Sequence, residues 1–223
     1  MISDEERWDE THKKSHNPEE IHSVYAEEKE KLFPRGSLVV DLGGGTGGDA
    51  LYFLQKGHSV VILDISSFAL GIAQAKAKKH NLQEKLAVKQ VDFGLHALPI
   101  KPDSADVAYS RISLHYYGKN HTTKLFIYIY EILKPGGTAY LTFKSPEDIE
   151  EMDYLRNIGV EYEPNVYIEN GQLRSRFDVD QLKSMVAQAD ITNFEVKPYK
   201  EELRDKHGLK TALLVNEVSF KKV

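Results

Sequence analysis

A turn carrying five glycines constrains the fold more than any other part of the sequence. Apolar residues over 37–42 predict a fully buried strand, and residues 49–56 predict a helix. Between them lies Gly43-Gly44-Gly45-Thr46-Gly47-Gly48. Glycine has no Cβ, so backbone N–H groups in such a turn can approach a ligand closely. The segment therefore predicts a strand–turn–helix unit that binds a small molecule at the helix N-terminus.

Strands and helices alternate along most of the chain. Further strands are expected over 59–63, 85–91, 105–110 and 138–143, and further helices over 18–32, 66–80, 123–133 and 179–189. This alternation predicts a parallel sheet with helices on both faces. Two final strands, over 192–196 and 211–220, have no helix between them and should pair antiparallel. Residues 145–176 are polar and predicted to be irregular.

Composition narrows the functional classes. The 223 residues carry a formal net charge of -5, which disfavours nucleic acid as the main substrate. The chain has no cysteine, which excludes disulfides, thiolate zinc sites and a cysteine nucleophile. No apolar run approaches the ~20 residues of a membrane span, and the acidic N-terminus is unlike a signal peptide. We expect one cytoplasmic domain without a membrane or metal partner; His12 and His16, four residues apart, lack a third ligand in register.

Charge around the turn indicates which ligand it takes. Gly43-x-Gly45-x-x-Gly48 fits a dinucleotide fingerprint, whereas Asp41-x-Gly43-x-Gly45-x-Gly47 is an acidic variant. Asp41 and Asp49 flank the turn and would repel a pyrophosphate by about 1 kcal/mol or more each at ~4 Å. They would favour an ammonium or sulfonium. Asp64 ends the second strand at the spacing where a carboxylate meets ribose hydroxyls.

These residues resemble the class I, Rossmann-like S-adenosylmethionine-dependent methyltransferases, in particular those acting on small molecules. The resemblance covers roughly residues 20–144 and includes Val91-Asp92-Phe93 and Leu133-Lys134-Pro135-Gly136-Gly137. It departs at Ala189-Asp190, where many relatives have a Gly-aromatic step. It implies an α/β fold: a doubly wound, mostly parallel seven-stranded sheet with an antiparallel last strand.

The resemblance also implies the cofactor S-adenosyl-L-methionine, its product S-adenosyl-L-homocysteine, and a set of binding residues. Gly43 and Gly45 should lie under the methionine and ribose, Asp41 near the amino group, and Asp64 at the ribose. Asp92 and Phe93 should meet the adenine, and the backbone of Ser110 the methionine amine. The remaining candidates are turn, strand-end and covering residues: Gly44, Gly47, Ile65, Trp8 and Tyr25.

The acceptor side is less defined. His115 follows the fourth strand, at the edge where ligands bind in open α/β sheets, and is the candidate general base. Tyr116 and Tyr117 could wall the acceptor cavity, and Arg111 could pair with an anionic acceptor or with a nearby acid. The segment after the fourth strand lacks the Pro-Pro-aromatic step of amino-directed nucleic-acid methyltransferases, so a small-molecule acceptor is expected.

The expected organisation is one domain, 1–223, with four parts. They are an N-terminal lid and helix (1–33), a cofactor-binding core (37–144), a substrate-recognition insertion (145–176), and a C-terminal helix and strand pair (177–223). Two alternatives stay open at this point: an NAD(P)-dependent oxidoreductase using the same turn, and a cofactor-binding module without catalysis. The acceptor and the oligomeric state are not encoded in any motif of the sequence.

Overall fold

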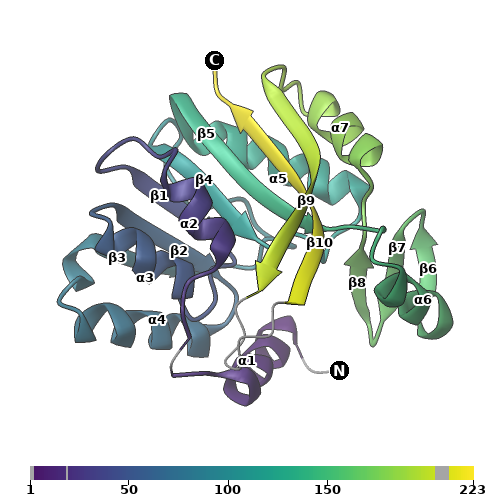
Figure 1. Cartoon of the computed structure of the whole chain (residues 1–223), viewed down its shortest axis with the longest axis horizontal. Coiled ribbons are helices and arrows are strands. Elements are labelled where there is room, and N and C mark those ends of the chain that lie inside the picture. Colours follow the sequence, from purple (N-terminus) through teal and green to yellow (C-terminus); the bar gives the residue numbers. More distant parts are fainter. Residues whose placement is uncertain (1–2, 19, 204–210) are drawn as a thin grey trace.

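One seven-stranded sheet organises the protein (Figure 1). The computed structural model describes residues 3–18, 20–203 and 211–223. The strand order is β3-β2-β1-β4-β5-β10-β9. The strands are β1 (Leu38–Leu42), β2 (Ser59–Asp64), β3 (Leu86–Gln90), β4 (Ala105–Arg111), β5 (Leu133–Lys144), β9 (Phe194–Leu203) and β10 (Thr211–Lys221). Strands β1 to β5 run parallel, and β10 runs antiparallel between β5 and β9.

Helices cover both faces of this sheet. One face carries α2 (Val24–Glu30), α3 (Gly48–Gln55) and α4 (Ser67–Lys79), and the other carries α5 (Lys119–Ile132) and α7 (Val179–Gln188). Each face has its own apolar core, since successive residues of a buried strand point to opposite sides. Val39 packs with Phe53 and Leu70 on one side, and Val40 with Phe126 and Met185 on the other.

Two smaller parts lie at the rim of the sheet in Figure 1. Helix α1 (Asp4–Ser15) crosses its lower end, and a three-stranded antiparallel sheet stands at the right beside α6 (Ile149–Ile158). This small sheet consists of β6 (Val160–Glu163), β7 (Val166–Glu169) and β8 (Gln172–Ser175). A short 3-10 helix, η1 (Gln83–Lys85), precedes β3.

The predicted fold class is confirmed: the sheet has seven strands, is mostly parallel, and ends in antiparallel pairing with helices on both faces. Two local predictions are wrong. Residues 145–176 form α6 and the small sheet. The strands of this sheet have four residues each, which is too short for a periodicity analysis to detect. The helix expected over 18–32 begins only at Val24, because Ser23 caps it by accepting from the amide of Ala26.

Within the described residues, no helix is both long and apolar enough to cross a bilayer.

Gly47 makes the first turn of α3 possible in two ways. Its φ is +76°, a left-handed conformation that costs other residues ~1–2 kcal/mol. A Cβ at Gly47 would also lie 2.8 Å from the Cβ of Ala73 in α4. Close packing of α3 against α4 therefore depends on this glycine.

Substituting Gly47→Ala should lower the free energy of unfolding by more than Gly57→Ala does. Gly57 also has a positive φ, +96°, but a Cβ there would meet nothing within 4 Å. Gly57→Ala is therefore the control that measures the cost of the backbone strain alone. The additional loss of unfolding free energy in Gly47→Ala measures the clash with Ala73, which we expect to cost ~1–3 kcal/mol. Urea denaturation of both variants measures this. Equal losses would show that α3 and α4 do not pack tightly at this point.

Candidate functional site

Two adjoining cavities lie where β1, β2, β3 and β4 end. The larger has a volume of about 940 Å³ and the smaller about 360 Å³. His12, Gly43 and Arg111 line both, so the cavities adjoin at the start of the glycine turn. In open α/β sheets, ligands bind at this carboxyl edge, where the strand order reverses. The reversal here falls between β1 and β4.

Asp64 ties the glycine turn to the next helix. One carboxylate oxygen accepts from the amide of Gly45 at 2.9 Å, and the other from the amide of Ser66 at 2.8 Å. Burial raises the pKa of Asp64, and the hydrogen bonds from these two amides oppose that rise. The side chain lines the larger cavity, and each oxygen retains a lone pair for a further donor.

Asp41 is buried beneath the turn without a partner for one oxygen. It is 2% exposed, lines the smaller cavity, and its Oδ2 accepts no hydrogen bond. Burial, followed by the charges of Asp49 and Asp64, raises the pKa of Asp41 well above its ordinary value. A buried, unpaired carboxyl is costly to ionise, so the arrangement favours a cationic ligand nearby.

Asp49 has partners on both oxygens. It accepts from the amide and hydroxyl of Ser23, at 2.6 and 2.9 Å, and from the Tyr109 hydroxyl at 2.7 Å. This carboxylate therefore fixes the start of α2 to α3 and β4. It still lines the smaller cavity, and its charge contributes to the raised pKa of the Asp41 carboxyl.

Asp92 and Phe93 lie at the far end of the larger cavity, with Ile65 beside Asp64. Asp92 accepts from the amide of Gly94 at 2.7 Å. The side chain of Gln90, which the sequence did not single out, donates to the carbonyl of Ile65 at 3.1 Å. The Asp92 carboxylate and the Phe93 ring thus line the same cavity as Asp64, 28 and 29 residues farther along the chain.

Helix α1 bridges the larger cavity. At one side, Asp9 accepts from the Ser66 hydroxyl at 2.6 Å and from the amide of Phe68 at 3.1 Å, so it caps α4 from outside. At the other side, Arg7 donates to the carbonyl of Asn170 in the β7–β8 hairpin at 2.7 Å. Trp8 lies between, lining the cavity with its ring edge-on to Tyr116 at 5.0 Å.

Ile112 has a strained backbone at the mouth of the site. Its φ is +54°, which is rare for a β-branched side chain. Its amide donates to the Thr142 hydroxyl at 3.1 Å, and it lines the larger cavity with Ser113. Ser113 also sets the glycine turn, since a Cβ on Gly43 would lie 2.3 Å from its Cβ. Such strain persists where the surrounding structure requires it, typically at functional sites.

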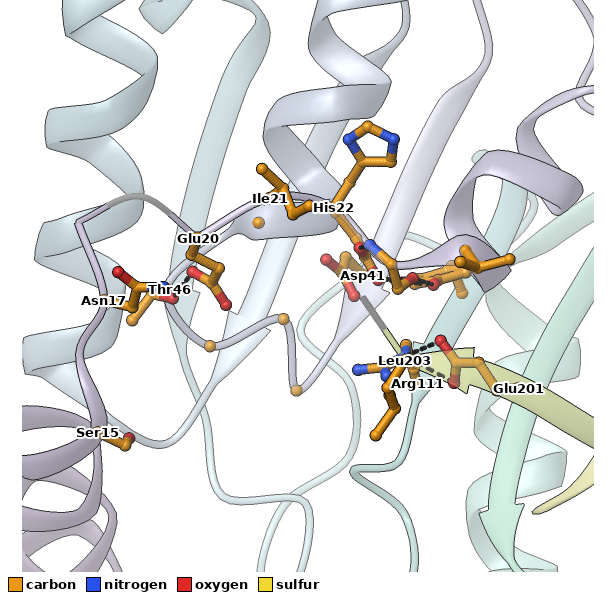
Figure 2. Close-up of a pocket in the computed structure, with 18 of the residues that line it drawn as sticks. Ser15, Asn17, Glu20, Ile21, His22, Asp41, Thr46, Arg111, Glu201 and Leu203 are labelled. Atoms are coloured by element: carbon orange, nitrogen blue, oxygen red, sulfur yellow. Dashed lines mark hydrogen bonds and ion pairs between the residues drawn. The ribbon is translucent and has the colours of Figure 1, made fainter. Parts of the chain in front are cut away.

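Arg111 pairs with Glu201 rather than with Asp64. Its Nε lies 2.8 and 2.9 Å from the two Glu201 oxygens, and Figure 2 shows the pair on the wall opposite Glu20 and Thr46. Glu201 is fully buried, and Arg111 lines both cavities. Of the alternatives left open for Arg111, the structure therefore supports an acid partner.

Three expected side chains do not reach either cavity. His115 is 3% exposed and lies behind Tyr116, where burial and the charges of Arg176, Lys144 and Arg174 hold its pKa well below the ordinary value. This position gives no support to the expected general base, because such a base must contact the proton that it removes. Tyr25 is fully buried between Tyr109 and Tyr199.

The third is Ser110, whose fully buried hydroxyl donates to the carbonyl of Leu42 at 2.8 Å. Gly47, as described above, faces Ala73 and also lies outside both cavities.

The other candidates lie together around the two cavities. The members of this group are Trp8, Asp41, Gly43, Gly44, Gly45, Asp64, Ile65, Asp92, Phe93, Arg111, Tyr116 and Tyr117. Sequence reasoning missed Asp9, Gln90, Ile112, Ser113 and Glu201. Ile112 and Ser113 lay in the segment after the fourth strand that the sequence analysis had considered, and Gln90 lay in the predicted third strand. Asp9 and Glu201 act through contacts 57 or more residues away in the chain.

Comparison with known proteins agrees with this geometry. Residues 39–137 match a family model described as a methyltransferase domain. The chain is 33% identical over 107 residues to the S-adenosyl-L-methionine-dependent Diels-Alderase of Talaromyces variabilis, covering 47% of this chain and 35% of the relative. It is 29% identical over 118 residues to the phosphoethanolamine N-methyltransferase of Plasmodium falciparum, covering 52% and 42%. The chain thus spans less than half the length of these relatives.

Solved structures share the fold across nearly the whole chain. The protein described under "Conversion of a Disulfide Bond into a Thioacetal Group during Echinomycin Biosynthesis" has a TM-score of 0.71 at 18% identity, covering 98% of this chain and 92% of that one. A SAM-dependent methyltransferase from Methanosarcina mazei has a TM-score of 0.70 at 20% identity, covering 91% and 99%.

The sheet order and the glycine turn define a Rossmann-like α/β fold, which the chain shares with these solved structures. The match to the methyltransferase-domain family model covers residues 39–137, which include the glycine turn, Asp64, Asp92 and β4.

Replacing Asp9 with alanine should release α1 from α4. Burial raises the pKa of Asp9, but the hydrogen bonds from Ser66, the Phe68 amide and Ser67 leave it lowered overall. The stabilisation that the Asp9 carboxylate gives to the packing of α1 on α4 is therefore complete above the ordinary Asp pKa of ~3.9. It is lost as the pH falls through the lowered pKa of Asp9. At neutral pH we expect α1 amides to exchange about tenfold faster in Asp9→Ala, from the loss of a ~1–2 kcal/mol cap.

Glu10→Ala is the matched control, since Glu10 only meets Lys14 on the exposed side of α1. Hydrogen exchange read by mass spectrometry distinguishes the two. Equal exchange in both variants would contradict the docking role of Asp9.

Proposed function

We propose that the protein transfers the methyl group of S-adenosyl-L-methionine to a small-molecule acceptor. The observation that carries the proposal is the buried, unpartnered Asp41 carboxyl beneath a glycine turn that Asp64 also flanks. Three carboxylates around one turn favour a ligand with positive charge and no phosphate. The S-adenosyl-L-methionine dependence of several similar proteins supports the same cofactor.

The described residues fit this cofactor along its length. Asp64 can accept from the ribose hydroxyls with the lone pairs that Gly45 and Ser66 leave free. Asp92 and Phe93 provide an acceptor and an apolar ring for the adenine. Gly43 and Gly45 line the space for the methionine portion, and Asp41 would face its ammonium.

When bound, the cofactor supplies an electrophilic methyl group on a positively charged sulfur. The chain's own contribution is positioning, because aligning an acceptor with such a centre at ~3–3.5 Å lowers the barrier by several kcal/mol. Tyr116 and Tyr117 line the larger cavity and would orient the acceptor. Trp8 and α1 would keep water out of the closed site.

We extend the proposal to the organisation of the chain. Residues 1–33 include the lid formed by α1, 37–144 hold the cofactor, and 145–176 recognise the acceptor through the β7–β8 hairpin. The support is that Gly171, Gln172 and Leu173 of this hairpin line the same cavity as Asp64 and Asp92.

The proposal is tested by titrating the purified protein with S-adenosyl-L-homocysteine and, separately, with NADH and NADPH. Calorimetry should detect the homocysteine compound and neither dinucleotide. Methyl-labelled cofactor, offered with a panel of hydroxyl, thiol, amine and carboxylate acceptors, should then yield a labelled product. Tight NAD(P)H binding without S-adenosyl-L-homocysteine binding would favour an oxidoreductase. Cofactor binding without turnover on any acceptor would favour a non-catalytic module.

Asp64→Asn should weaken S-adenosyl-L-homocysteine binding by about 10-fold to 100-fold, since hydrogen bonds to a charged acceptor contribute ~1.5–3 kcal/mol. Asp103→Asn is the control, because Asp103 is 60% exposed, pairs with Lys222 and lines neither cavity. Calorimetry gives the affinities, and thermal unfolding verifies that both variants are folded. Unchanged affinity in folded Asp64→Asn would remove Asp64 from the ribose site.

Asp41 should make cofactor affinity depend on pH. Its raised pKa means that the carboxyl is protonated above the ordinary ~3.9, so a ligand ammonium must draw the proton off. S-adenosyl-L-homocysteine should therefore bind more tightly as the pH rises toward the folded-state pKa of Asp41, and level off above it. In Asp41→Asn this rise should flatten. A wild-type profile that is already flat from pH 4 to pH 8 would contradict the role.

A further inference from the structure

The small sheet has an apolar outer face that continues from the larger cavity. Val160 of β6 lies opposite Ile168 of β7, and Ile168 lies opposite Leu173 of β8. Residues directly opposite in antiparallel strands share one face, so these three form a row across the sheet, about 10 Å wide at ~4.8 Å per strand. We refer to Val160, Ile168 and Leu173 as the apolar row.

Helix α6 covers the face of the small sheet opposite the apolar row. On the row's own face, Val166, two residues before Ile168 in β7, is buried in the main core, so the exposed part of that face lies at Ile168 and Val160. Tyr167 alternates with Ile168 and is buried against Met152 and Leu155 of α6. The row therefore lies on the face away from α6, where alternation would ordinarily place polar residues. Val160 is 69% exposed and Ile168 38% exposed. Exposed apolar side chains gathered in this way mark a binding surface more often than a solvated one.

The row begins inside the candidate site. Leu173 lines the larger cavity and packs partly against the main core. Leu95, 76% exposed, lines the same cavity from the loop after β3. Near Gly118, which follows Tyr117 of the cavity wall, β6 presents the Glu163 carboxylate, and the ring of Tyr162 lies farther away. The cavity and the apolar row are thus joined through Leu173, which lines the cavity and lies opposite Ile168.

Charge argues against a second copy of this chain on the edge of the small sheet. Strand β6 carries Glu161 and Glu163, and antiparallel pairing of two β6 strands would bring these like charges together. The continuity with the cavity instead favours a molecule that already occupies the site.

We propose that the methyl acceptor is amphiphilic: its reactive head enters the larger cavity, and an apolar tail lies along the apolar row. This inference rests on the proposed function and specifies its substrate class. The specificity determinants are Leu173, Ile168 and Val160, in order of distance from the cavity.

The test uses the full chain with methyl-labelled isoleucine, leucine and valine, observed by NMR with and without saturating S-adenosyl-L-homocysteine. The probes are n-butanol, n-hexanol and n-octanol, which are neutral and differ only in apolar length. The methyls of Leu173 and Ile168 should shift, and affinity should rise about twofold to fourfold per added methylene. Shifts confined to other methyls, or affinity independent of length, would overturn the inference.

Three glutamate variants locate the tail. Val160→Glu and Ile168→Glu should weaken n-octanol binding at least tenfold, read at Leu173, because a charge on the row must be desolvated. Ile149→Glu is the matched control, since Ile149 is 70% exposed on α6 and outside the row. Equal losses in all three variants would overturn the assignment. All the changed side chains are exposed to solvent, so each variant should fold, and S-adenosyl-L-homocysteine affinity should stay within twofold.

The two proposals fail separately. If S-adenosyl-L-homocysteine does not bind while the alcohols keep their length dependence at Leu173, the proposed function is wrong and the apolar row is a binding surface for another purpose. If the cofactor product binds and the length dependence is missing, the tail is wrong and the proposed function stands.

Discussion

The carboxylate of Asp64 holds the site together. It accepts from Gly45 in the turn after β1 and from Ser66 at the start of α4, so one buried charge joins three segments. Ser66 in turn donates to Asp9, which brings α1 over the cavity. One chain of hydrogen bonds therefore positions the glycine turn, α4 and α1. The lone pairs that remain on Asp64 are available to a ligand in the larger cavity.

Negative charge is concentrated at this point. Asp41 and Asp49 lie on either side of the turn, and only Asp49 has donors on both oxygens. The protein thus keeps a buried carboxyl whose ionisation is costly in the ligand-free state. Such a group reduces stability unless a cation comes near, which is why its presence says more about the ligand than about the fold.

The sheet could be predicted from the sequence because buried parallel strands are continuous apolar runs. The glycine turn added to this, since it indicates a strand–turn–helix unit. The sequence also predicted that Asp41, Asp64, Asp92 and Phe93 lie together at the cavities, because all four lie at or just after the carboxyl ends of strands. It was insufficient for α1, whose polar sequence shows no apolar stripe and whose position depends on Asp9 and Arg7 meeting distant segments. The small sheet was missed because its strands have four residues each. His115 was placed in the cavity by its proximity to β4, yet the chain turns at Ile112 and buries it behind Tyr116.

Helix α1 is fastened at two places, to α4 through Asp9 and to the β7–β8 hairpin through Arg7, and both fastenings straddle the larger cavity. If α1 is the lid proposed above, a ligand bound beneath it would depart only when at least one fastening breaks. The opening of α1 is then a unimolecular step that precedes ligand entry. The observed association rate should therefore reach a plateau at high ligand concentration. The height of that plateau equals the frequency with which α1 lifts, a property of residues that never touch the reacting atoms.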